Sequence, residues 1–165
     1  MPITSVITRY RAEGSGGLGL LNANEPSVVQ PAGSGGVDPA VGLLFDSGTS
    51  NFAFGLRWGS GNGFADLSGV ATAAHIHGPT ASNAPLAFAE TAGVANDFNG
   101  TRMDIHTLPG FDSSASTGSA RGQFTFNAAL VAQLQAGRMY FNVHTAQNGY
   151  AALGMLIAKC VHVSL

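Results

Sequence analysis

Short runs of alternating apolar and polar residues, separated by clusters of Gly, Ser, Asn and Asp, dominate this chain. Such alternation over four to eight residues is the pattern of half-buried β-strands, and the clusters are typical of the turns between them. The pattern predicts strands at residues 3–11, 40–46, 51–58, 69–77, 85–90, 102–108, 118–126, 138–145 and 151–163. Residues 22–39 are rich in Gly, Pro and Ser without a clear period, so we expect a long loop there.

One segment has helical rather than strand spacing. Leu130, Val131 and Leu134 share one face of a helix, Asn127 is a suitable N-cap, and Gly137 can end the helix in a left-handed conformation. We therefore predict one short helix at residues 127–136. Many strands, Gly-rich turns and one helix favour an all-β fold, a Greek-key β-sandwich or barrel. The length of 165 residues fits a single domain covering residues 1–165.

Composition excludes several classes of partner. Only 10% of residues are charged and the net charge is -2, so no basic stripe suits nucleic acid. The apolar runs are shorter than the roughly 18 residues of a spanning helix, so no membrane span is expected. Cys160 is the single cysteine and cannot form an internal disulfide. The low charge and abundant Gly, Ser, Thr and Asn favour a secreted or periplasmic protein, although residues 1–10 do not resemble a signal peptide.

Three of the five histidines lie in two strand-like motifs, HIHG at residues 75–78 and NVHT at residues 142–145. Residues i and i+2 of a strand point to the same face, about 6 to 7 Å apart. His75 and His77 can therefore converge on one ion, and His144 from another strand can supply a third imidazole. Neutral imidazole binds copper, zinc, iron or nickel. We expect a metal site, with copper or zinc as the ion.

Other side chains can complete this site. His106 alternates with Asp104 on one face of its predicted strand and is a fourth candidate ligand. Metal-bound imidazoles usually donate their second N–H to an oxygen. Candidates for such supporting roles are Tyr140, Asn142, Thr145, Asp104 and Glu90. In the alternative interpretation, the histidines only hydrogen-bond within the strands and bind no metal.

Several motifs follow one another in a recognisable order: LNANEP at residues 21–26, a Gly-bounded strand at Gly42, AAHIHGP at 73–79, an apolar segment at 130–137 and YFNVHT at 140–145. This order resembles the CHRD domain, the family named after chordin. The resemblance implies an all-β domain of about this length, usually secreted, with no widely established enzymatic activity. The chain departs from the family at residues 150–155, where Ala151 and Leu153 replace a usual Glu and Arg. The resulting apolar final strand suggests cover by a protein partner or a second copy in a homo-oligomer.

Three functions remain open. The first is a metal-binding β-module, and the second is a metalloenzyme with a redox centre like that of copper-zinc superoxide dismutase, or with a hydrolytic centre. That second likeness rests on the HxH pair and on fold analogy, and the sequence shows neither a second ligand run nor a disulfide pair. The third is a structural or self-associating module without metal. Serine nucleophile and phosphate-loop motifs are absent from the sequence.

Overall fold

The described strands form one antiparallel sheet. The computed structural model describes residues 5–13, 35–67, 69–83, 92–146 and 153–159. The strands in these residues are β1 (Ile7–Glu13), β2 (Gly35–Val37), β3 (Leu43–Asp46), β4 (Asn51–Trp58), β5 (Ala71–His77), β6 (Ser119–Thr125), β7 (Met139–Thr145) and β8 (Leu153–Lys159). Their order is β2-β4-β3-β1-β8-β7-β5, and β6 pairs with β4. The prediction of an all-β fold is confirmed.

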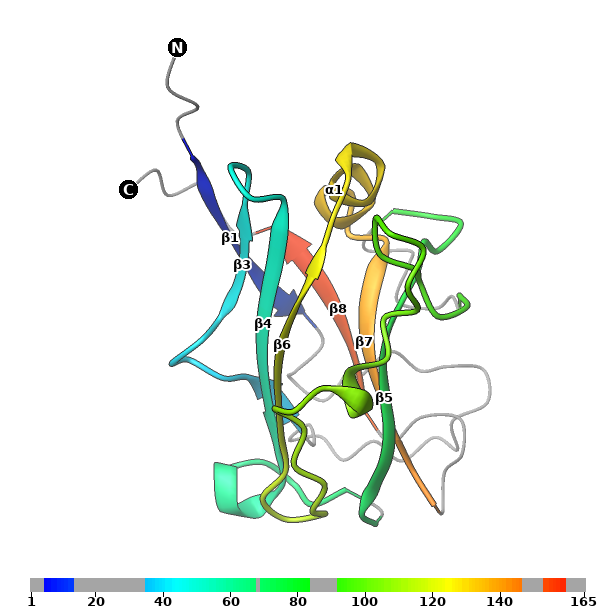
Figure 1. The fold of residues 1–165 in the computed structure, drawn as a ribbon. Helices are drawn as coiled ribbons and strands as arrows, with labels where there is room; N and C mark the ends of the chain where they lie inside the picture. Colours follow the sequence, from blue (N-terminus) through cyan, green and yellow to red (C-terminus); the bar gives the residue numbers. More distant parts are fainter. Residues whose placement is uncertain (1–4, 14–34, 68, 84–91, 147–152, 160–165) are drawn as a thin grey trace.

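The sheet curls into two facing layers, as Figure 1 shows. β3, β4 and β6 lie in one layer, and β5, β7 and β8 lie in the other. β1 joins the layers, because its first half pairs with β3 and its second half pairs with β8. The chain crosses between the layers from β4 to β5, from β5 to β6 and from β6 to β7. β8 is therefore an inner strand, hydrogen-bonded to β1 and β7, and does not form a free edge.

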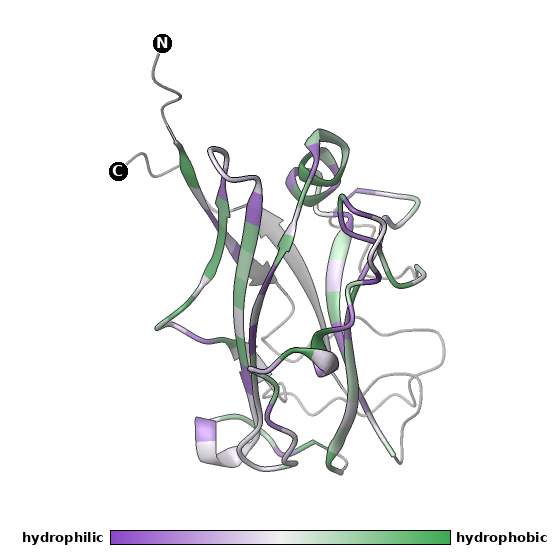
Figure 2. Ribbon diagram, in the orientation of Figure 1, coloured by the Kyte–Doolittle hydropathy of each residue, from purple (hydrophilic) through white to green (hydrophobic). Residues whose placement is uncertain are grey.

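Aromatic and aliphatic side chains fill the space between the layers. Alternate residues of β4 point inward and are fully buried, and Figure 2 shows the alternating hydropathy along this strand. Phe54 of β4 meets Phe141 of β7 with ring centroids 5.5 Å apart. Ile76 of β5 and Val143 of β7 are also fully buried in this core. Ile76 and Val143 therefore face the core. The residues directly before and after each of them in the strand point to the outer face of the sheet.

Residues 92–118 cover the free edges of β5 and β6. Ala95 donates its backbone N–H to Ile76, and Ile76 donates to Met103, so this segment pairs with β5. Further along, Arg121 of β6 donates its backbone N–H to Gly110. The segment thus satisfies backbone groups that would otherwise form an open template for association. It also brings residues 102–106 beside β5.

The predicted helix is present as α1 (Ala128–Gln135). The side chain of Asn127 accepts a hydrogen bond from the backbone N–H of Leu130 at 2.9 Å, as an N-cap does. At the other end, Arg138 donates its backbone N–H to Gln133, and Gly137 is left-handed with φ 67°. These contacts form a Schellman motif, so both signals for the helix ends are confirmed. None of the helices among the described residues has the length and apolar character to cross a membrane.

Two predictions about strands were wrong. Residues 102–108 do not form a strand, because only Arg102 and Asp104 make isolated bridges before the 3-10 helix η3 (Ile105–Thr107) begins. Thr107 closes this turn by donating its hydroxyl to the carbonyl of Asp104. The expected loop at residues 22–39 contains β2, whose two glycines gave no strand signal. A further 3-10 helix, η1 (Ser60–Asn62), occupies the predicted Gly-rich turn after β4. The predicted strand at residues 85–90 lies outside the described residues.

The glycine after the HIH motif is required by its surroundings. Gly78 has φ 141°, and a Cβ at this position would lie 2.8 Å from the carbonyl oxygen of Arg138. We expect Gly78→Ala to lower the free energy of unfolding by about 1–3 kcal/mol, through backbone strain and this contact. Urea denaturation measures the change. Gly93→Ala is the matched control, because a Cβ there meets nothing within 4 Å. Equal stability of the two variants would contradict the prediction.

Candidate metal centre

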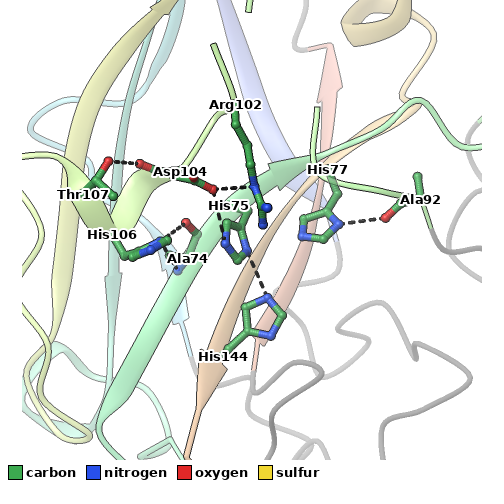
Figure 3. A network of polar contacts seen from close by, with 9 residues as sticks. All are labelled: Ala74, His75, His77, Ala92, Arg102, Asp104, His106, Thr107 and His144. Atoms are coloured by element: carbon green, nitrogen blue, oxygen red, sulfur yellow. Dashed lines mark hydrogen bonds and ion pairs between the residues drawn. The ribbon is translucent and has the colours of Figure 1, made fainter. Parts of the chain in front are cut away.

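Paired strands bring three histidines together on the outer face of the sheet. His75 of β5 lies opposite Asn142 of β7, and the neighbouring register pairs are Ala73 with His144 and His77 with Tyr140. His144 is therefore diagonal to His75, within reach of its side chain. Figure 3 shows the three imidazoles gathered at this place. We call His75, His77 and His144 the three-histidine group.

The ring nitrogens in this group are close to one another. Nδ1 of His75 lies 3.1 Å from Nε2 of His144. One nitrogen from each of the three residues lies within 4.8 Å of the others. Two nitrogens bound to one tetrahedral ion at about 2.0–2.1 Å would lie about 3.3–3.4 Å apart. The His75–His144 separation is thus near that of a metal site, and the ring centroid of His77 lies 5.5 Å from that of His75 and 6.2 Å from that of His144.

His77 is held in one orientation by a backbone carbonyl. Its Nδ1 lies 2.8 Å from the carbonyl oxygen of Ala92, which can only accept a hydrogen bond. Nδ1 therefore carries the proton, and Nε2 of the neutral ring has a free lone pair. Nε2 is buried and has no hydrogen-bond partner within the described part of the chain. A buried acceptor left without a partner is costly unless a ligand satisfies it.

Tyr140 fixes the same carbonyl from a second direction. Its hydroxyl donates to the Ala92 carbonyl at 3.1 Å and accepts from the Ala92 backbone N–H at 2.9 Å. Its ring stacks on the imidazole of His77, with ring centroids 5.1 Å apart. Tyr140 therefore positions both His77 and the oxygen that selects the tautomer of His77.

His75 has a different supporting partner, a carboxylate. Nε2 of His75 lies 3.4 Å from Oδ1 of Asp104, and Nε of Arg102 lies 2.8 Å from the same oxygen. The carboxylate favours the tautomer of His75 in which Nε2 carries the proton. The lone pair of Nδ1 then points toward His144. A carboxylate behind a histidine is a common arrangement at metal sites, where it orients the ring.

Burial keeps the two β5 histidines uncharged. It lowers the pKa of His75 to about 4, and the positive charges that His144 and His77 carry when protonated act in the same direction. Burial also lowers the pKa of His77, against the opposing effect of its hydrogen bond to Ala92. His75 and His77 are only 7% and 9% exposed to solvent. Both imidazoles are therefore neutral near pH 7, the state that binds metal.

His106 lies on the other side of His75. Its ring centroid is 5.1 Å from that of His75, and its Nδ1 is 3.1 Å from the carbonyl oxygen of Ala74. His75, Asp104 and His106 each offer a ligand atom within 4.8 Å of the others. We call these three residues the Asp104 group. The two groups share His75.

The family model of the CHRD domain matches residues 21–153 of the chain. The chain belongs to the CHRD family. The match includes both histidine motifs and every residue of the two groups just described. No curated protein and no solved structure matches this CHRD domain significantly.

The residues predicted from the sequence of this CHRD domain differ in where the structure places them. The face prediction for β7 is confirmed, since Phe141 and Val143 lie in the core opposite the histidines. His106 was expected on a strand and instead lies in η3, yet the turn still brings it to His75. Asn142 and Thr145 are buried residues of β7. Glu90 and the altered residues 150–152 lie outside the described residues.

Two residues that support the histidines, Ala92 and Arg102, were not predicted from the sequence. Ala92 acts through its backbone carbonyl, which no residue type can signal. Arg102 stands two residues before Asp104, a spacing that places both side chains on one side of an extended segment. That spacing was a usable signal for the ion pair between them.

Proposed function

We propose that this CHRD domain binds a transition-metal ion, copper or zinc, through His75, His77 and His144. The observation that carries the proposal is the state of His77, whose proton is fixed on Nδ1 while its buried Nε2 has no partner among the described residues. A buried histidine that only braced two strands is expected to place both nitrogens in hydrogen bonds, as most buried polar atoms do. A histidine prepared for a metal keeps one lone pair free and anchors the other nitrogen.

The donor set supports copper or zinc. Three neutral imidazoles are typical ligands of both ions, whereas magnesium and calcium prefer oxygen ligands. In this assignment Nδ1 of His75 and Nε2 of His77 and His144 bind the ion. Asp104 and Ala92 orient two of the rings from behind. The sheet supplies rigidity, because all three ligands lie on paired strands.

The family match and the composition also support a proposal about the compartment. We propose that the domain acts in a secreted or periplasmic setting, which the CHRD match and the low content of charged residues support. The expected homo-oligomer or protein partner remains a prediction. The apolar final strand does not offer a free edge to such a partner, because β8 is paired on both sides. The large exposed apolar residues among those described are Val70 and Phe98.

Metal analysis of protein prepared without a histidine tag tests the proposal. We expect the wild-type protein to retain zinc or copper after dialysis, and His77→Ala to lose it. Thr72→Ala is the matched control, because Thr72 is an exposed residue of the same strand and has no ligating imidazole. Circular dichroism of each variant verifies the fold. Retention of equal metal by His77→Ala, or no binding by the folded wild-type protein, would refute the proposal.

The hydroxyl of Tyr140 gives a milder test of the same site. Tyr140→Phe keeps the ring on His77 but removes both hydrogen bonds to Ala92. Loss of such a supporting contact typically weakens metal binding by about 10–100-fold. Isothermal titration calorimetry with zinc measures the change. Unchanged affinity would show that Tyr140 does not position the ligand.

Three protein ligands leave one position on a tetrahedral ion free for water or substrate. This free position favours a metalloenzyme as the second candidate function, with a redox or a hydrolytic centre. In such a centre, the metal would exchange electrons or lower the pKa of its bound water. Cyclic voltammetry of the copper-loaded protein tests for the redox centre. A reversible couple lost in His77→Ala supports redox chemistry, and its absence excludes the redox centre and leaves the hydrolytic centre and the binding module.

A further inference from the structure

His75 faces two different sets of ligand atoms with its two ring nitrogens. Nδ1 points to His144, and Nε2 points to Asp104, as the dashed contacts in Figure 3 show. These nitrogens lie on opposite sides of the imidazole ring. An ion bound at Nδ1 therefore leaves the Nε2 side available. Asp104 and His106 gather on that side.

We propose that the Asp104 group binds a second metal ion, with His75 bridging the two ions as an imidazolate. This inference rests on the proposed function, because the first ion at the three-histidine group is what prepares the bridge. The ligands of the second ion are Nε2 of His75, a carboxylate oxygen of Asp104 and a ring nitrogen of His106.

The geometry of the Asp104 group fits a single ion. The 3.4 Å between Nε2 of His75 and Oδ1 of Asp104 is close to the roughly 3.3–3.4 Å expected for two ligands of one tetrahedral ion. The His75 and His106 rings are nearly perpendicular, at 86°. The three ligand atoms already lie within 4.8 Å of one another. Side-chain rotations that bring these atoms to about 3.3–3.4 Å from one another would close the site around one ion.

Binding of the second ion requires one proton to leave. In the form with one ion, Nε2 of His75 carries a proton that faces the carboxylate of Asp104. The second ion replaces this proton, which passes to the solvent, and the metal–nitrogen bond takes its place. The first ion on Nδ1 favours the step, because a bound cation makes the ring more acidic.

The ligand types suggest a different preference for each group. The Asp104 group mixes imidazole with carboxylate, a donor set that is common for zinc. The three-histidine group has only imidazole, which suits copper as well. Arg102 competes for the same oxygen of Asp104, but its side chain is 57% exposed and can move into solvent. Removal of Arg102 should therefore strengthen binding of the second ion.

Copper titration followed by electron paramagnetic resonance (EPR) tests the second site. Two Cu(II) ions joined by one imidazolate are magnetically coupled, so the signal at two equivalents falls below twice the signal at one equivalent. We expect this loss in the wild-type protein and an uncoupled, single-copper signal in His106→Ala. Calorimetry with zinc should give two equivalents for the wild type and one for His106→Ala. Arg102→Ala should bind the second ion more tightly.

The outcomes separate this inference from the proposed function. One equivalent in the wild-type protein, with the same affinity in His106→Ala, overturns the second site and leaves the three-histidine site standing. Two equivalents with additive EPR signals overturn the bridge. No binding at all refutes both. Asp104→Asn provides a second variant, and it should lose the second equivalent while keeping the fold.

Discussion

His75→Ala should remove both equivalents of metal, because His75 is the one residue common to the two groups. We expect the affinity for the first ion to fall at least about 100-fold, beyond the effect typical of a supporting contact. The bridge to a second ion is lost at the same time. Calorimetry with zinc and copper measures both effects. His106→Ala is the comparison, since it should lose the second ion only.

A folded His75→Ala variant that still binds one ion tightly would contradict this prediction. Such a result would mean that His77 and His144 suffice with a ligand from elsewhere. Thermal unfolding of the metal-free variant verifies that the change has not simply unfolded the sheet. His75 points to the outer face, so its removal leaves the aromatic core between the layers intact.

Acidic pH should destabilise the metal-free protein. The pKa of His75 is lowered by burial from 6.5 to about 4 in the folded protein, so the unfolded chain binds a proton first as pH falls. The free energy of unfolding should be insensitive to this group above pH 6.5 and decline as pH falls toward 4. We expect a loss of about 2 kcal/mol, allowing for solvent screening. His77, whose pKa is also lowered, adds to the loss.

The pH dependence of metal binding should follow the same two histidines, His75 and His77. Burial lowers the pKa of both His75 and His77, so protons compete with the metal for these rings at more acidic pH than for ordinary histidines, and affinity should persist there. At lower pH, metal affinity should fall more steeply than protonation of a single histidine would make it fall, because more than one ligand takes up a proton. Urea denaturation and zinc titration between pH 4 and 8 measure both trends. A metal-free His75→Ala protein with the same pH dependence of stability as wild type would contradict the assignment.

Local signals predicted the regular part of this fold well. Asn127 and Gly137 marked the ends of α1, because capping depends on residues adjacent in sequence. The alternation in residues 51–58 located β4, since each inward side chain there is apolar. The face of β7 that carries His144 followed from the same alternation. Period-two patterns are reliable where one face of a strand is buried in a core.

The sequence predicted less about the segment that covers β5. Met103 and Ile105 alternate with polar residues as in a strand, but both are buried where the chain enters the 3-10 helix η3, which begins at Ile105. Their burial depends on contacts with strands distant in sequence, which no local pattern records. The convergence of His75 and His144 depended on the pairing of β5 with β7, which spacing could suggest but not fix. The carbonyl of Ala92 carried no sequence signal at all.

Anomalous diffraction from crystals of the zinc-loaded protein tests metal binding by the three-histidine group directly. We predict a zinc peak bound by Nδ1 of His75 and by Nε2 of His77 and His144, at about 2.0–2.1 Å from each nitrogen. Nδ1 of His77 should keep its hydrogen bond to Ala92. A zinc peak elsewhere in the domain, with the three imidazoles free of metal, would contradict metal binding by the three-histidine group.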